Sequence, residues 1–84
     1  MKYWIYIIYS KTKDKYYVGQ TKDIANRLSE HIKNKNLGAT DWELKYTEEF
    51  PNRSEAIKRE TVIKSKKRRT YIEWLINSTN RDNG

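Results

Sequence analysis

The chain has 84 residues, enough for one domain but not for two. It has no cysteine, which excludes disulfides and thiolate metal clusters, and no stretch approaches the roughly 20 apolar residues that a membrane span needs. The 18 Lys and Arg against 11 Asp and Glu give a net charge of +7, while 13% aromatic residues argue against a disordered chain. We therefore expect one small folded domain with a polyanionic partner, either nucleic acid or a membrane surface.

Residues 3–19 are rich in Tyr and Ile, and we expect two strands, 3–9 and 15–19, joined by a turn. The first strand is apolar on both faces, so it is expected to be covered on both sides. If the loop holds an even number of residues, Tyr6 and Tyr17 project from the same face. The two phenols either fill a pleated surface, as strand tyrosines commonly do, or position a water or a phosphate.

The next element is expected to be a helix over residues 21–36, capped by Thr21 or Asp23. Its apolar residues recur at every fourth position and form a narrow buried stripe, namely Ile24, Leu28 and Ile32. Arg27 and His31 lie about 100° around the helix from that stripe, at the rim of the core. They form either an ordinary amphipathic shoulder or a pair that reaches solvent and the sheet edge together.

Alternation of apolar and polar residues predicts a half-buried strand over 42–50, which Pro51 ends. A second helix, capped by Asn52 or Ser54, is expected to run to about residue 64, and a third over about 66–77. The domain then comprises residues 1–77, followed by a flexible polar tail over 78–84.

Glu60 is the sharpest local anomaly, because helical spacing places it between Ala56 and Ile63 on the apolar face of the second helix. A buried carboxylate is costly unless it is paired, protonated or bound to a metal. With 18 cations in the chain, an ion pair and a metal site both remain open.

A dense basic run follows that helix and is either a solvated connection or a contact with a phosphate backbone. It consists of Lys64, Lys66, Lys67, Arg68 and Arg69. The chain has no glycine-rich phosphate loop and no zinc spacing, and its single histidine excludes a histidine cluster for a metal.

Taken together, these residues resemble the GIY-YIG nuclease superfamily. The two half-motifs read Trp4-Ile5-Tyr6 and Tyr17-Val18-Gly19. Residues 19–28, with Arg27, look like the signature helix of the family, and residues 55–60 look like the helix that bears its metal-binding glutamate. The resemblance covers residues 2–76 and is closest to the small stand-alone bacterial members.

The resemblance implies an α+β domain with a three-stranded antiparallel sheet and three helices, in the order β-β-α-β-α-α. It also implies an endonuclease that cleaves phosphodiester bonds in DNA or structured nucleic acid with one divalent ion, Mg²⁺ or Mn²⁺. Carried over to this chain, Glu60 is the metal ligand and Arg27 stabilises phosphate charge. Tyr6 and Tyr17 position or deprotonate the nucleophile, and His31 matches a histidine of some branches.

Three positions depart from the family pattern. Trp4 replaces the first motif glycine, Gln20 stands where some branches place a lysine, and Asn77 is only a candidate for the C-terminal asparagine. A phenol is a poor base at its reference pKa of about 10 and would need a metal-bound water or a nearby cation to lower that pKa. Which tyrosine acts as the base therefore stays open. The residues expected to contact nucleic acid are Gln20, Lys22, Lys64, Lys66, Lys67, Arg68 and Arg69.

The expected partner is DNA, branched or damaged DNA included, in repair or recombination. The expected state is a monomer, with a weak dimer as the alternative. Residues 1–9 make a poor secretory signal, so a cytoplasmic location without membrane association is expected. Two other functions stay open: a catalytically inactive basic nucleic-acid-binding module of the same fold, and a basic membrane-surface protein.

Overall fold

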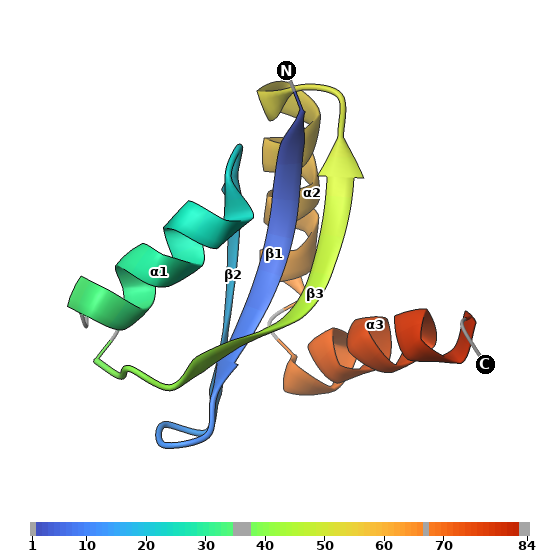
Figure 1. The fold of residues 1–84 in the computed structure, drawn as a ribbon. Coiled ribbons are helices and arrows are strands. Elements are labelled where there is room, and N and C mark those ends of the chain that lie inside the picture. The colour runs from blue at the N-terminus through green and yellow to red at the C-terminus, as the bar shows by residue number, and fades with distance from the viewer. Residues whose placement is uncertain (1, 35–37, 67, 83–84) are drawn as a thin grey trace.

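A computed structural model describes residues 2–34, 38–66 and 68–82. The elements run in the order that the sequence predicts, β-β-α-β-α-α (Figure 1). They are β1 (Tyr3–Ser10), β2 (Lys15–Thr21), α1 (Ile24–Asn34), β3 (Trp42–Phe50), α2 (Arg53–Ser65) and α3 (Arg69–Asp82). No helix in the described ranges is both long enough and apolar enough to cross a lipid bilayer.

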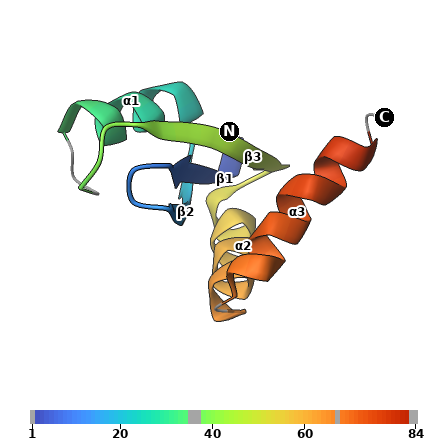
Figure 2. The same ribbon diagram turned by 90° about the horizontal axis from the view of Figure 1, so that it is seen from below.

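The three strands form one antiparallel sheet in the order β2-β1-β3, so β1 is the central strand. Ser10 pairs with Lys15 across the turn at residues 11–14, and Ile8 pairs with Tyr17. This register places Tyr6 and Tyr17 on the same face, as expected for an even-numbered loop. Figure 2 shows α1 on one face of the sheet and α2 with α3 on the other.

Both faces of β1 are buried, as its sequence predicts. Ile5 and Ile7 are fully buried and pack with residues of β2, α2 and α3, namely Val18, Ile63 and Leu75. Tyr6 and Ile8 pack on the opposite face with Ala39, Trp42 and the partly buried apolar residues of α1, Leu28 and Ile32. Because both faces of β1 remove apolar surface from water, this strand contributes to both core clusters of the domain.

Of the two cap candidates that the sequence offers for each helix, Asp23 caps α1 and Asn52 caps α2. Asp23 Oδ1 accepts a hydrogen bond from the Asn26 amide at 3.0 Å, and Asn52 Oδ1 accepts one from the Glu55 amide at 3.0 Å. Thr21 instead ends β2, where it pairs with Trp4, and for this reason α1 begins at residue 24 and not at 21. The predicted end of this helix at residue 36 lies outside the described residues.

The third helix differs from its prediction at both ends. It begins at Arg69 because the Lys66 amide still donates to the carbonyl of Ile63 in the last turn of α2. The Arg68 carbonyl then accepts from the amides of Tyr71 and Ile72, which starts α3. The helix continues to Asp82, so residues 78–82 of the expected polar tail are helical, and residues 83–84 lie outside the described part.

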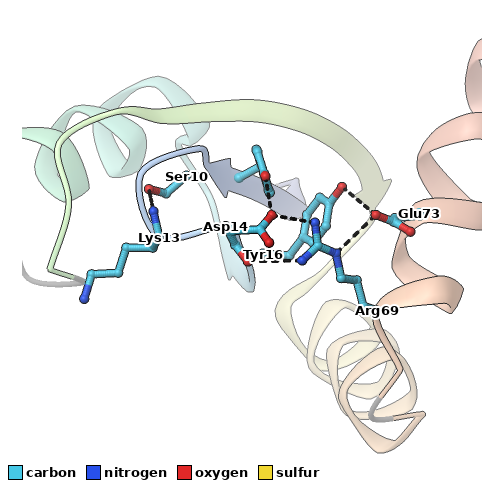
Figure 3. A network of polar contacts seen from close by, with 7 residues as sticks. Ser10, Lys13, Asp14, Tyr16, Arg69 and Glu73 are labelled. Atoms are coloured by element: carbon cyan, nitrogen blue, oxygen red, sulfur yellow. Dashed lines mark hydrogen bonds and ion pairs between the residues drawn. The ribbon is translucent and has the colours of Figure 1, made fainter.

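The β1–β2 turn is held at two points. Asp41, just before β3, accepts hydrogen bonds from Ser10 Oγ at 2.6 Å and from the Thr12 amide and hydroxyl at 2.9 Å. On the other side, Arg69 Nη2 donates to Asp14 Oδ1 at 2.7 Å (Figure 3). Asp14 has a positive φ of 52°, a conformation that aspartate tolerates better than most residues. The turn is therefore tied both to β3 and to α3.

These donors make the turn sensitive to acid. The hydrogen bonds from Ser10 and Thr12 lower the pKa of Asp41 to about 2. Because the folded-state pKa lies below the unfolded value of about 4, this stabilisation is present above about pH 4 and is lost as the pH falls toward 2.

We predict that Asp41→Asn, which keeps one acceptor oxygen but cannot ionise, unfolds at a lower urea concentration than the wild type at neutral pH. The difference between the two midpoints should narrow as the pH falls from about 4 to about 2. Glu43→Gln, at an exposed position of β3, is the matched control and should show no such narrowing. A midpoint difference that stays constant across this pH range would contradict the assignment.

Candidate active site

The Tyr6 side chain reaches from the central strand across the edge strand. Tyr6 pairs with Gly19, and a Cβ placed on Gly19 would lie 2.5 Å from the Tyr6 Oη and 2.6 Å from its Cζ. Contacts below about 3 Å are essentially never made by real Cβ atoms, so only glycine lets the ring lie there. A glycine within a strand often marks a close approach of another group, and at Gly19 that group is the Tyr6 phenol.

His31 of α1 joins the two tyrosines. Its Nε2 lies 3.0 Å from the Tyr6 Oη, and its ring lies edge-on to Tyr17 with centroids 5.3 Å apart. The Tyr6 and Tyr17 ring centroids are 6.3 Å apart. His31 is only 3% exposed, so it lies within the core and not at the rim where helical spacing predicts it. Arg27, one turn earlier, is exposed as predicted.

Burial controls the protonation of Tyr6. Desolvation raises the pKa of Tyr6 well above its usual value, and the neighbouring Tyr17 raises it further. The positive charge of Arg27 opposes this rise, while the carboxylate of Glu60 adds to it. Tyr6 therefore keeps its proton at neutral pH, and its hydroxyl lies within hydrogen-bond distance of His31 Nε2.

Glu60 of α2 is half-buried and ion-paired. Its side chain is 19% exposed, and its Oε2 lies 2.8 Å from the Nζ of Lys64 one turn later. The same Nζ lies 5.9 Å from the centroid of the Tyr17 ring. The ion-pair alternative for Glu60 is thus realised, and it is realised beside the tyrosines. Because the Lys64 side chain is 53% exposed, a solvent-accessible anion can compete with Glu60 for its ammonium group.

Two hollows flank this cluster along β2. The first, which we call the aromatic hollow, has a volume of about 410 Å³, and its lining includes Tyr16, Tyr17, Val18, Ile63, Lys64 and Arg68. The second, which we call the polar hollow, has a volume of about 260 Å³, and its lining includes Gln20, Lys22, Asn26, Arg27, Glu30 and Arg53. Gly19 and the overlying Tyr6 ring lie between the segments of β2 that line the two hollows.

Comparison with known proteins places the chain in a family. The family model described as the GIY-YIG catalytic domain matches residues 2–73. The chain belongs to the GIY-YIG family. It is also similar to the solution NMR structure of the UPF0213 protein BH0048 from Bacillus halodurans, with 28% sequence identity and a TM-score of 0.60. That match covers 92% of this chain and 84% of the other. None of the curated proteins matches the chain significantly.

These findings confirm the resemblance and the α+β fold that the sequence predicts. GIY-YIG proteins are nucleases, so membership implies a nucleic-acid substrate. The two half-motifs lie side by side on β1 and β2, since Trp4 pairs with Thr21 and Tyr6 pairs with Gly19. Trp4, which replaces the first motif glycine, projects from the same face as Tyr6.

The structure brings together most of the expected GIY-YIG site residues. Tyr6, Tyr17 and His31 are in contact, and Glu60 and Arg27 lie within electrostatic reach of Tyr6. Arg27 is half-exposed, with its Nε 3.5 Å from Glu30 Oε1. Asn77 lies on α3 in a separate recess with Tyr16 and Glu73. The lining of this recess includes none of the expected catalytic residues, which are Tyr6, Tyr17, Arg27, His31 and Glu60.

The basic run is divided among different environments. Lys64 and Arg68 line the aromatic hollow, whereas the Lys66 ammonium lies 5.6 Å from the ring centroid of Tyr71 on α3. Arg69 also borders the hollow, but it forms ion pairs with Asp14 and Glu73 and so connects the β1–β2 turn to α3. Lys67 lies outside the described residues. The expected contacts Gln20 and Lys22 line the polar hollow.

Two further cations, which no sequence motif marks, border the hollows: Lys15 the aromatic hollow and Arg53 the polar hollow. They come from different elements and share no spacing with the motif residues. Only the net charge of the chain hinted at cations in such places.

A divalent cation, as the GIY-YIG family implies, has one evident ligand here. The described residues contain no group of three or more His, Asp or Glu side chains suited to a metal. Mg²⁺ is commonly held by one or two carboxylates and completed by waters and substrate phosphates. The partly exposed Glu60 carboxylate beside the phenols fits such a site, with Lys64 as its partner in the free protein.

We predict that Gly19→Ala displaces the Tyr6 ring, lowers the free energy of unfolding by about 1–3 kcal/mol and weakens the contact between Tyr6 and His31. Urea unfolding and the NMR shift of the His31 ring protons measure the two effects. In a Tyr6→Val background the same substitution should cost much less, because valine does not reach Gly19. Equal costs in both backgrounds would show that the Tyr6 ring is not what requires glycine.

Proposed function

We propose that this protein is an endonuclease that hydrolyses phosphodiester bonds in DNA or structured nucleic acid with one divalent ion, Mg²⁺ or Mn²⁺. The observation that carries this proposal is the contact of Tyr6, Tyr17 and His31 at the Gly19 edge of β2, with the Glu60–Lys64 pair beside Tyr17 and Arg27 on the same helix as His31. Family membership supports the nuclease class.

In this proposal, Glu60 holds the cation, which when bound neutralises phosphate charge and acidifies a coordinated water. Arg27 borders the polar hollow with a half-exposed guanidinium, so it can meet the phosphate from the other side of Tyr6. The Lys64 ammonium group can exchange its ion pair with Glu60 for one with an incoming phosphate, because both side chains are accessible to solvent. These groups supply positive charge where negative charge develops in the transition state.

The two tyrosines have different roles. Tyr6 is buried and keeps its proton, so its hydroxyl serves to orient His31 through their hydrogen bond of 3.0 Å. Tyr17 is half-buried and lines the aromatic hollow, so its hydroxyl can meet the attacking water or the substrate. We therefore assign the contact with the nucleophile to Tyr17 Oη and the positioning of the site to Tyr6.

Glu60→Gln is predicted to abolish metal-dependent nicking of supercoiled plasmid while leaving DNA binding in EDTA largely unchanged, because the amide does not hold a hard cation well. Nicking is measured under single-turnover conditions and binding by gel shift. Glu55→Gln, at an exposed position of the same helix, is the matched control and should cleave like the wild type. Wild-type cleavage by Glu60→Gln would remove the metal role from this residue.

Arg27→Ala is predicted to lower the single-turnover rate constant by about 10²–10³, as the loss of one preformed donor to developing charge commonly does. Lys33→Ala removes an exposed cation from the same helix and serves as the control. An unchanged rate constant for Arg27→Ala would exclude this arginine from transition-state stabilisation.

A second candidate function is a nucleic-acid-binding module without cleavage. The Glu60–Lys64 ion pair of 2.8 Å, which engages the one carboxylate of the cluster, is the observation that favours it. Plasmid that is bound with a steep salt dependence but never nicked, in Mg²⁺ or Mn²⁺, would select this function over the first.

A further inference from the structure

The aromatic hollow has features that hydrolysis itself does not use. Its floor is apolar: Val18 is 6% exposed, Ile63 is 2% exposed, and Ile72 is partly buried. Its walls include Tyr16, which is half-buried and packs against the same cluster as Val18 and Ile63, and the adjacent edge-strand residue Tyr17. An apolar floor beside aromatic rings favours a flat, aromatic ligand over a simple anion.

The rim of the same hollow is cationic. Lys15 and Arg68 are exposed and form no ion pair with any other residue that the structure describes. Arg69 and Asp14, which also border it, neutralise each other at 2.7 Å (Figure 3). The remaining charge of Lys15 and Arg68 is complementary to a phosphate attached to the flat ligand. The volume of about 410 Å³ lies within the range of about 300–1,000 Å³ that is typical of small-ligand sites.

The hollow is continuous with the candidate active site. Tyr17 and Lys64 belong to its lining, and the same Lys64 is paired with Glu60. The polar hollow on the other side of Gly19 is smaller, at about 260 Å³, and is lined almost wholly by polar residues such as Gln20, Lys22 and Arg53. The two sides of the site are thus chemically unequal, and only one of them offers apolar and aromatic surface together.

We propose that the aromatic hollow is a nucleotide subsite, which binds the base and one phosphate of the nucleotide next to the bond that is cut. The base lies on the apolar floor against the Tyr16 ring, and Arg68 and Lys15 hold the phosphate. This assignment rests on the proposed nuclease function for its place beside the cleaved bond. The binding of a nucleotide in the hollow can be measured without any cleavage.

The test is a titration of the full chain with deoxyadenosine 5′-monophosphate in EDTA, followed by amide NMR shifts. Saturable shifts are expected at residues 15–18, 63–64 and 68–72. Deoxyadenosine and inorganic phosphate, titrated separately, should each bind at least about tenfold more weakly, because each satisfies only one part of the site. Equal binding of phosphate alone would overturn the proposal, and so would shifts confined to residues 20–27.

Two variants keep the test independent of folding. Arg68→Ala should weaken nucleotide binding about tenfold. The variant should still fold, because the first hydrogen bonds of α3 are accepted by the backbone carbonyl of Arg68 and do not involve its side chain. Lys15→Ala should weaken binding in the same direction, whereas Arg53→Ala, in the polar hollow, should not. If Arg68→Ala and Lys15→Ala both bind like the wild type, the hollow is not the nucleotide site.

Failure of the subsite and failure of the nuclease proposal give different results. Glu60→Gln should still bind the mononucleotide in the hollow, since the proposed contacts do not include Glu60. A protein that nicks plasmid but does not bind the mononucleotide refutes the subsite alone. A protein that binds the mononucleotide in the hollow but never nicks plasmid supports the binding site and refutes the nuclease function.

Discussion

The contact between the Tyr6 ring and Gly19 is the constraint on which the site depends. Tyr6 belongs to a core cluster with Ile8 and Trp42, and it is also the residue whose hydroxyl meets His31. The ring can hold both positions only because the facing residue on β2 has no side chain. Burial in that core is also the main reason why the pKa of Tyr6 is raised. Stability and chemistry therefore rest on one side chain.

The site as a whole is assembled at an edge and not in a cavity of its own. β2 is an edge strand, and the residues around it come from both sides of the sheet: His31 and Arg27 from α1, Glu60 and Lys64 from α2. The open edge leaves two hollows that differ in polarity. Under the proposed function, an open edge of this kind gives a nucleic-acid chain room to pass along the strand.

Much of the fold could be predicted because its signals are local. Two-sided apolarity predicted that β1 is covered on both faces, and the cap candidates before α1 and α2 included the residues that serve, Asp23 and Asn52. The ends of α3 were wrong, since polar residues 78–82 continue a helix that composition assigned to a tail. Polarity alone does not end a helix when no glycine or proline follows within it.

The site was predictable where motif and periodicity agreed, and less so where distant residues meet. The low exposure of Glu60 follows from its place between Ala56 and Ile63, and its spacing of four residues from Lys64 was a visible signal for the observed pair. By contrast, Arg69 was expected on a phosphate, but it is held by Asp14, which is 55 residues away in sequence. The lining of each hollow likewise combines residues of a strand with residues of helices, so no single stretch of sequence predicts either hollow.

The central position of β1 bears on how the domain is acquired during synthesis. β1 emerges from the ribosome before every other element, yet Ile63 and Leu75, which cover one of its faces, are synthesised much later. A nascent β1–β2 hairpin lacks both α1 and α2 and is at best marginally stable in water. The edge of β2 that carries Tyr17 and Gly19 is therefore surrounded by its partners His31 and Lys64 only after α1 and α2 have been synthesised.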